Sequence, residues 1–167
     1  MAPRKHPAIS VVVEDSRWRE DSSVLRLIRR AARLALSGSD KPRSKAPVLT
    51  ILLADDAKLR TLNARFRGHN KPTNVLSFPA SLPDGPYLGD VALGRGVVAR
   101  QARAQGKSLA AHAAHLVIHG ILHLTGHDHE KPNDARMMEA FETGLLAKLA
   151  IADPYAPRHY TRRGKAA

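Results

Sequence analysis

Two short aliphatic runs constrain the fold of this chain more than any other feature. Residues 8–13 (AISVVV) and 48–53 (VLTILL) are too short for buried helices, and their composition is typical of strands. Two further strand candidates, 74–78 (NVLSF) and 87–93 (YLGDVAL), flank a loop that contains proline and glycine. The chain is therefore predicted to build a small sheet of about four strands.

Helical patterns alternate with these strands and follow them. The expected helices are 22–36, capped by Ser22 or Ser23; one that opens at Asp55 and Asp56; 97–105; one from Ser108 to just before Gly126; and 133–150. The arginines of the first helix gather on one side, which we interpret as a solvated face. No internal repeat or domain boundary interrupts the pattern. We expect one α/β domain with about five helices over residues 1–152, followed by a flexible basic tail over 153–167.

The charge of the chain points to a polyanionic partner. Its 27 Lys and Arg outnumber 15 Asp and Glu, which gives a formal net charge of +12. No fold requires that excess, and it suits nucleic acid first and an anionic membrane surface second. Six of the nine histidines fall between His112 and His129, whereas the basic residues are concentrated elsewhere. The two groups must meet in space if they share a function.

Cysteine and long apolar stretches are both missing from the sequence. The lack of cysteine excludes disulfides, thiolate metal sites and thiol nucleophiles. No stretch reaches the roughly 18 apolar residues of a membrane span, and no apolar run of signal length follows the basic N-terminus. These features predict a cytoplasmic protein that has no membrane partner.

The most informative segment carries the pattern H-x-x-x-H-x-x-G-x-x-H. His119 and His123 are one helical turn apart, so their rings project from one face and can share a metal ion. Gly126 breaks the helix, and the chain can turn back to present His129. This is the zinc spacing of metzincin peptidases, with Gly120 in place of the catalytic glutamate. Three imidazoles leave a fourth position open, which is the arrangement of a catalytic metal site.

The neighbouring histidines are interpreted differently. His115 lies one turn too early for a site that closes through Gly126, and we expect it to pack or to orient a ligand. His127 is the residue most easily mistaken for a ligand, and it should point elsewhere if His129 points inward.

A second constellation precedes the third strand candidate, in the segment RGHNKPTNVLSFP. Arg67 and Lys71 flank Gly68, and a Pro-Thr-Asn turn follows. Such a loop offers a guanidinium, an ammonium and backbone N–H groups to a phosphate, although many solvated loops have the same composition.

Together these stretches resemble the bacterial YbeY family of metal-dependent endoribonucleases. The family pattern H-G-x-L-H-L-x-G-Y-D-H aligns with 119–129, and R-G-x-x-x-P-T-N-V-L-S-F-P aligns with 67–79. The short L-G-D element aligns with 88–90. One departure is His127, which stands where the family usually has tyrosine.

The resemblance implies specific roles and a fold. His119, His123 and His129 would bind one Zn²⁺, Arg67 would match the family's functional arginine, and the metal would sit in a cleft of an α/β fold with a small mixed sheet. The implied activity is single-strand-specific RNA cleavage in 16S rRNA 3′-end maturation and ribosome quality control. The implied partners are rRNA precursors, the ribosome and ribosome assembly factors, while the oligomeric state stays open.

The sequence leaves two alternative functions open. One is a metzincin-like zinc hydrolase, which the histidine spacing favours but Gly120 and the net charge oppose. The other is a non-catalytic RNA- or ribosome-binding assembly factor whose zinc only stabilises the fold.

Overall fold

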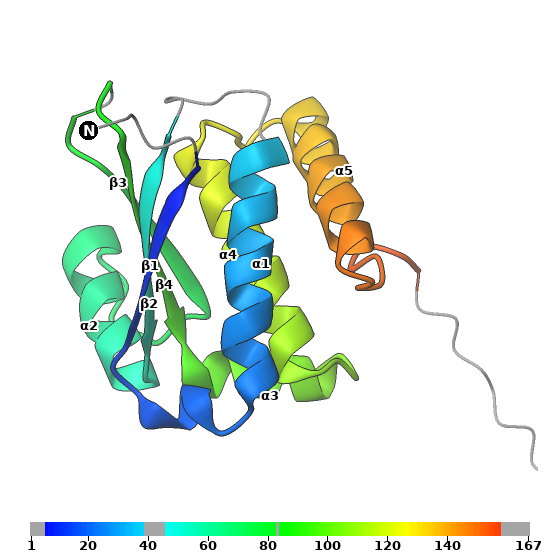
Figure 1. Ribbon diagram of the computed structural model, residues 1–167. Coiled ribbons are helices and arrows are strands. Elements are labelled where there is room, and N and C mark those ends of the chain that lie inside the picture. Colours follow the sequence, from blue (N-terminus) through cyan, green and yellow to red (C-terminus); the bar gives the residue numbers. More distant parts are fainter. Residues whose placement is uncertain (1–5, 39–45, 83, 158–167) are drawn as a thin grey trace, which may run out of the picture.

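The sheet has four strands in the order β1-β2-β4-β3. The computed structural model describes residues 6–38, 46–82 and 84–157 (Figure 1). The strands are β1 (Ala8–Val13), β2 (Val48–Ala54), β3 (Val75–Pro79) and β4 (Tyr87–Gly94). β1, β2 and β4 are parallel, and β3 pairs antiparallel with β4 at the edge. The expected small mixed sheet is confirmed.

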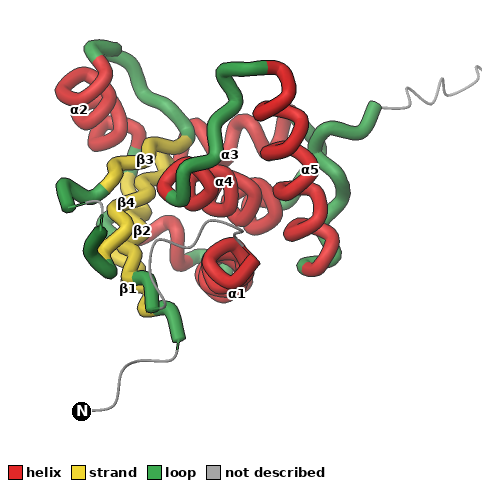
Figure 2. The backbone as a smooth tube through the Cα atoms, turned by 90° about the horizontal axis from the view of Figure 1, so that it is seen from above, coloured by secondary structure: helices red, strands yellow, loops and turns green. Residues whose placement is uncertain are grey.

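Helices cover both faces of this sheet. They are α1 (Ser22–Gly38), α2 (Asp56–Arg67), α3 (Arg95–Ala104), α4 (Leu109–Leu124) and α5 (Pro132–Lys148), with a 3₁₀ turn over Ser16–Arg19. Figures 1 and 2 show α2 alone on one side, while α1, α4 and α5 lie on the other. The predicted single α/β domain with five α-helices is confirmed for the described residues. None of these helices is long and apolar enough to cross a membrane.

The main core lies between the sheet and the helices α1 and α4. Successive residues of a strand point to opposite faces. Val91 and Leu93 of β4 are therefore buried against the α1 and α4 side, while Ala92 faces Leu59 of α2. Trp18 closes the main core, fully buried, with its indole N–H donating to the carbonyl of Ala54 at 3.0 Å. Burying these apolar side chains stabilises the layered arrangement.

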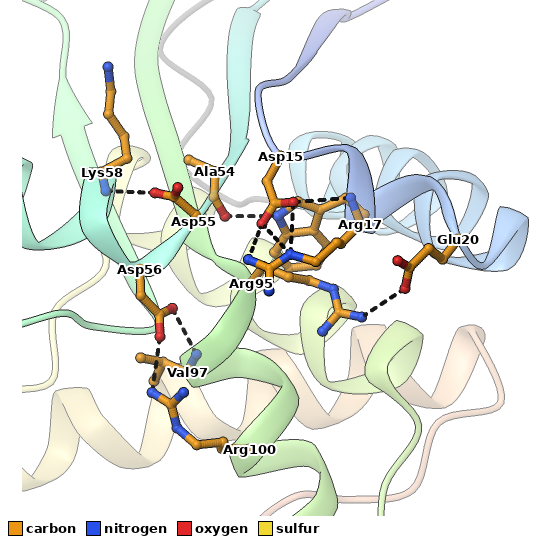
Figure 3. A network of polar contacts seen from close by, with 11 residues as sticks. Asp15, Arg17, Glu20, Ala54, Asp55, Asp56, Lys58, Arg95, Val97 and Arg100 are labelled. Atoms are coloured by element: carbon orange, nitrogen blue, oxygen red, sulfur yellow. Dashed lines mark hydrogen bonds and ion pairs between the residues drawn. The ribbon is translucent and has the colours of Figure 1, made fainter.

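Asp56 fixes the start of α3 beside α2, as Figure 3 shows. Its carboxylate accepts hydrogen bonds from the backbone N–H of Val97 at 2.9 Å and from the guanidinium of Arg100 at 3.0 Å. Gly96 makes this approach possible, because a Cβ there would lie 2.3 Å from Asp56 Oδ2. The carboxylate thus satisfies an N–H of the first turn of α3.

Gln101 of α3 then connects the start of β3 with α4. Its side-chain oxygen accepts from Asn74 Nδ2 and from His112 Nε2, both at 3.0 Å. Asn74 also caps the strand locally, since its own side-chain oxygen accepts from the N–H of Val75 at 2.7 Å. The loop that follows Arg67 is therefore anchored to the helix that carries the histidines.

The elements begin and end within two residues of the expected bounds, but the cap of one helix differs from the expected one. Ser108 caps α4 as expected, accepting from the N–H of Ala111 at 3.1 Å. The expected Ser22 or Ser23 cap of α1 is wrong. Asp21 fills that role, because its carboxylate accepts from the N–H of Ser23 at 2.8 Å and an ionised oxygen is a strong N-terminal acceptor.

The segment after α5 returns to the helix. Asp153 accepts from the hydroxyl of Thr143 at 3.2 Å and from the N–H of Tyr155 at 2.8 Å. The rest of the expected tail, 158–167, lies outside the described residues, so the division of the chain at 152 stays a prediction.

Candidate metal centre

Three histidines converge where α4 ends and the chain reverses. Their ligand atoms, one from each of His119, His123 and His129, all lie within 4.8 Å of one another. The Nε2 atoms of His119 and His123 are 3.1 Å apart. His119 and His123 are half-buried and His129 is exposed, so the cluster is accessible from one side. The three residues expected to share a metal are therefore brought together.

The turn after α4 explains how His129 reaches the other two. Gly126 has a φ of +94°, a backbone conformation that side chains disfavour. The N–H of His127 donates back to the carbonyl of Leu122 at 2.9 Å, which reverses the chain. Asp128 then accepts from the N–H of His129 at 2.6 Å and holds it in place.

The surroundings of His123 favour its neutral imidazole. Burial, together with the nearby His119 and His129, lowers the pKa of His123 to about 4. Its ring is therefore neutral at pH 7. A neutral imidazole keeps the lone pair that a metal ligand must donate.

A buried glutamate that the sequence analysis missed contacts His119. Glu142 of α5 is 0% exposed, and its Oε1 accepts from His119 Nδ1 at 2.5 Å. Its Oε2 accepts from His115 Nε2 at 2.9 Å and from the hydroxyl of Tyr155. Burial alone would raise the pKa of Glu142, but the hydrogen bonds from His115, His119 and Tyr155 lower it to about 2. The side chain is therefore an ionised acceptor for all three donors.

One sequence signal marks Glu142. It follows Met138 by four residues and precedes Leu145 by three, so it interrupts the buried stripe of α5 with a carboxylate. A charged residue in an apolar stripe needs buried partners. Tyr155 has no comparable signal, because it comes from an irregular segment.

The other three histidines between His112 and His129 lie outside the cluster, as expected for His115 and His127. His115 is packed against Glu142 and the ring of Tyr155, whose centroid is 5.8 Å away. His127 is buried, with its ring 5.2 Å from that of Phe141.

Gly120 is packed against the sheet too closely for any side chain. A Cβ at this position would lie 2.8 Å from Val91 Cγ1 and 3.0 Å from Ser77 Oγ. The position after His119, where a metzincin keeps its catalytic glutamate, therefore cannot carry a carboxylate in this arrangement. This geometry contradicts the metzincin-like alternative.

Arg67 is exposed and is the last residue of α2, the helix that Figure 1 shows on the other side of the sheet from α4. Gly68 ends the helix with a φ of +71°. Among the described residues, the guanidinium of Arg67 makes no hydrogen bond or ion pair. No bond fixes it to the histidines either, so its expected role stays a prediction.

Comparison with known proteins shows the family to which this chain belongs. A family model described as "Endoribonuclease YbeY" matches residues 13–150. The chain belongs to the YbeY family. A protein named Endoribonuclease YbeY from Chelativorans sp. (strain BNC1) is 46% identical over 153 residues, covering 89% of this chain and 93% of that protein. Its namesake from Gluconobacter oxydans (strain 621H) is 45% identical over 165 residues, covering 97% and 96%.

The solution structure of TM1509 from Thermotoga maritima has the same fold. It is 22% identical to this chain, with a TM-score of 0.55, and the match covers 89% of this chain and 99% of that one. The YbeY match includes the three clustered histidines, Glu142 and Arg67, while Tyr155 lies just beyond it. His127, the departure from the family pattern noted in the sequence, is not part of the cluster.

Proposed function

We propose that this chain is a zinc-dependent endoribonuclease that cleaves single-stranded RNA in the cytoplasm. Its proposed role is maturation of the 3′ end of 16S rRNA and ribosome quality control, in contact with the ribosome and its assembly factors. The observation that carries the proposal is the convergence of three histidine ligand atoms within 4.8 Å, in a chain whose relatives are named endoribonucleases.

The residues fit a single zinc ion. Tetrahedral Zn²⁺ with Zn–N bonds of about 2.0–2.1 Å would hold its ligand nitrogens about 3.3 Å apart. The 3.1 Å between the Nε2 atoms of His119 and His123 is close to that separation. Three nitrogen ligands with an exposed side at His129 favour a site that keeps one position open, as catalytic zinc sites do.

The chemistry requires a metal and a phosphate-binding group. When bound, Zn²⁺ supplies Lewis acidity to a phosphodiester and lowers the pKa of a water molecule toward about 7. Arg67 is proposed to bind the scissile phosphate and to offset the charge that grows in the transition state. Its guanidinium, which has no partner among residues 6–38, 46–82 and 84–157, supports this role, because a fork of N–H donors matches two phosphate oxygens.

Two features support RNA, and unpaired RNA in particular, as the substrate. The net charge of +12 favours a polyanion. Phe66, the residue before Arg67, is 57% exposed at the end of α2. An exposed aromatic ring can stack on an unpaired base but not on a base inside a duplex.

The test uses purified protein with a labelled RNA that carries the 3′ end of precursor 16S rRNA. We expect cleavage of the single-stranded form, little cleavage of a fully paired duplex, and none of casein. A chelator should abolish cleavage, and added Zn²⁺ should restore it. His119→Ala should be inactive, while His127→Ala serves as the matched histidine control.

Two results would contradict the proposal. Tight RNA binding and stoichiometric zinc without cleavage would favour the assembly factor whose zinc only stabilises the fold. Cleavage that persists after complete removal of metal would refute the zinc-dependent mechanism.

A further inference from the structure

Glu142 is a fully buried carboxylate held between two helices and a C-terminal segment. It lies on α5, while His115 and His119 lie on α4 and Tyr155 follows α5. An unpaired charge in such a place would be costly. Here both oxygens are occupied, since Oε1 accepts from His119 and Oε2 accepts from His115 and Tyr155. The arrangement therefore has every acceptor matched to a donor.

These contacts determine which nitrogen of His119 can bind a metal. An ionised carboxylate can only accept, so the hydrogen-bond network assigns the ring proton of His119 to Nδ1. The lone pair is then on Nε2, the atom that lies 3.1 Å from His123 Nε2. A carboxylate behind a metal-binding histidine fixes the tautomer, orients the ring and raises its basicity.

Tyr155 holds the carboxylate from the other side. Its hydroxyl donates to Oε2 of Glu142, and its ring stands nearly perpendicular to that of His115. Burial, with the neighbouring carboxylate of Glu142, raises the pKa of Tyr155, so the hydroxyl keeps its proton. Asp153 binds the N–H of Tyr155 and the hydroxyl of Thr143, which anchors this segment to α5.

We propose that Glu142 is the positioning residue of the metal centre and that Tyr155 keeps its carboxylate aimed at His119. This inference rests on the proposed metal site. It adds two residues, from the last helix and the segment after it, to a centre whose ligands come from α4 and its turn. A purely structural role for Glu142 would change the stability of the fold but not the affinity for metal.

The test compares zinc affinity and histidine tautomers in full-length protein. Zinc affinity is measured by competition with a chromophoric chelator. The tautomer of His119 is read from the ¹⁵N shifts of its ring in the metal-free protein. The variants are Glu142→Met, which has a similar length but no carboxylate; Glu142→Gln, which keeps one acceptor; and Tyr155→Phe, which loses only the hydroxyl. Glu139→Gln is the control, because Glu139 is exposed on the same helix.

We expect Glu142→Met to weaken zinc binding by about 10- to 100-fold and to remove the Nδ1–H bias of His119. Glu142→Gln should recover part of both, because its amide oxygen can still accept from Nδ1. Tyr155→Phe should weaken zinc binding by a smaller factor, and Glu139→Gln should match the wild type.

Several results would overturn the inference. One is a folded Glu142→Met variant whose zinc affinity stays within about twofold of the wild type. Another is weaker zinc binding with an unchanged His119 tautomer. If Glu142→Met and Glu142→Gln do not fold, Tyr155→Phe decides by the same two readouts. A wild-type protein that binds no zinc would instead refute the proposed metal site itself.

Discussion

The hydroxyl of Ser77 donates to the carbonyl of Gly120 at 3.1 Å, which joins β3 to α4 one residue from His119 of the histidine cluster. This contact brings the helix so close to the sheet that only glycine fits at position 120. The position of His119 therefore depends on the packing of a residue that has no side chain.

Gly120→Ala should destabilise the fold, because its Cβ meets the stiff side chain of Val91 at 2.8 Å. Overpacking costs about 1–3 kcal/mol, against about 1 kcal/mol gained in helix propensity. We expect a net loss of up to about 2 kcal/mol, measured by urea unfolding. Gly144→Ala is the control: it is helical with no atom within 4 Å of its Cβ, so it should stabilise by about 0.5–1 kcal/mol. Equal stability changes in the two variants would contradict the close packing.

Alanine at any of the three clustered histidines should abolish stoichiometric zinc, because within the described part of the chain only these rings converge. His127→Ala should keep the zinc and lose stability instead, since His127 is buried beside Phe141. Metal analysis of the purified variants checks both statements. Zinc lost from His127→Ala but retained by His129→Ala would mean that the ligands have been assigned incorrectly.

Arg67→Ala should leave folding and zinc content unchanged, because the guanidinium has no partner in the described part of the chain. Its free energy of unfolding should change by no more than about 0.5 kcal/mol, as for ordinary surface substitutions. Single-turnover cleavage should slow by about 100-fold or more, while RNA affinity changes little.

Two further variants make the Arg67 experiment decisive. Arg67→Lys should restore activity only in part, because an ammonium keeps the charge without the fork. Arg30→Ala, an exposed arginine on α1, should cleave at the wild-type rate. Activity per folded molecule that is unaffected in Arg67→Ala would remove this residue from the catalytic machinery.

His112 should make the metal-free fold sensitive to acid. Burial first, and then the nearby charges of His115 and Lys107, lower the pKa of His112 from 6.5 to about 4. Protonation therefore favours the unfolded chain. The contribution is complete above pH 6.5 and is lost as the pH falls toward 4, by up to about 3 kcal/mol at 1.36 kcal/mol per pH unit.

The matched variant for this prediction is His112→Gln, whose amide can still donate to Gln101. Urea unfolding of both metal-free proteins at pH 7 and pH 4.5 measures the effect. Wild type should lose more stability than the variant between the two values. Parallel losses would show that other groups carry the acid sensitivity.

Two truncations should separate RNA binding from metal binding. Ending the chain after Pro157 removes Arg158, Arg162, Arg163 and Lys165 but keeps Tyr155. If these four residues neutralise RNA phosphates, the slope of log affinity against log salt should become shallower by up to about 3. Zinc affinity should not change. Ending the chain after Ala152 also removes Tyr155 and should therefore weaken zinc binding. Titration with RNA measures the effect on the salt dependence, and titration with zinc measures the effect on metal affinity.

The convergence of the three histidines could be predicted from sequence because its geometry is local. His119 and His123 are one helical turn apart, and Gly126 allows the reversal that presents His129. The strands could be predicted equally well, because a short continuous aliphatic run is rarely anything other than a buried strand. Glu142 was missed because its partners are 23 and 27 residues away, and its pairing depends on how α5 packs against α4. The cap of α1 was misassigned because Asp21 and the two serines are all competent caps, and the backbone geometry decides among them.

The hydrogen bond between Tyr155 and Glu142 has a consequence for biosynthesis. A ribosome makes the chain from its N-terminus, so His119, His123 and His129 emerge before Glu142, and Tyr155 emerges later still. A nascent or prematurely terminated chain that ends after His129 but before Glu142 would already contain every histidine of the cluster but neither Glu142 nor Tyr155. Only chains translated past Tyr155 would thus bind zinc with full affinity. Unfinished chains would bind it more weakly and would lose it to finished ones.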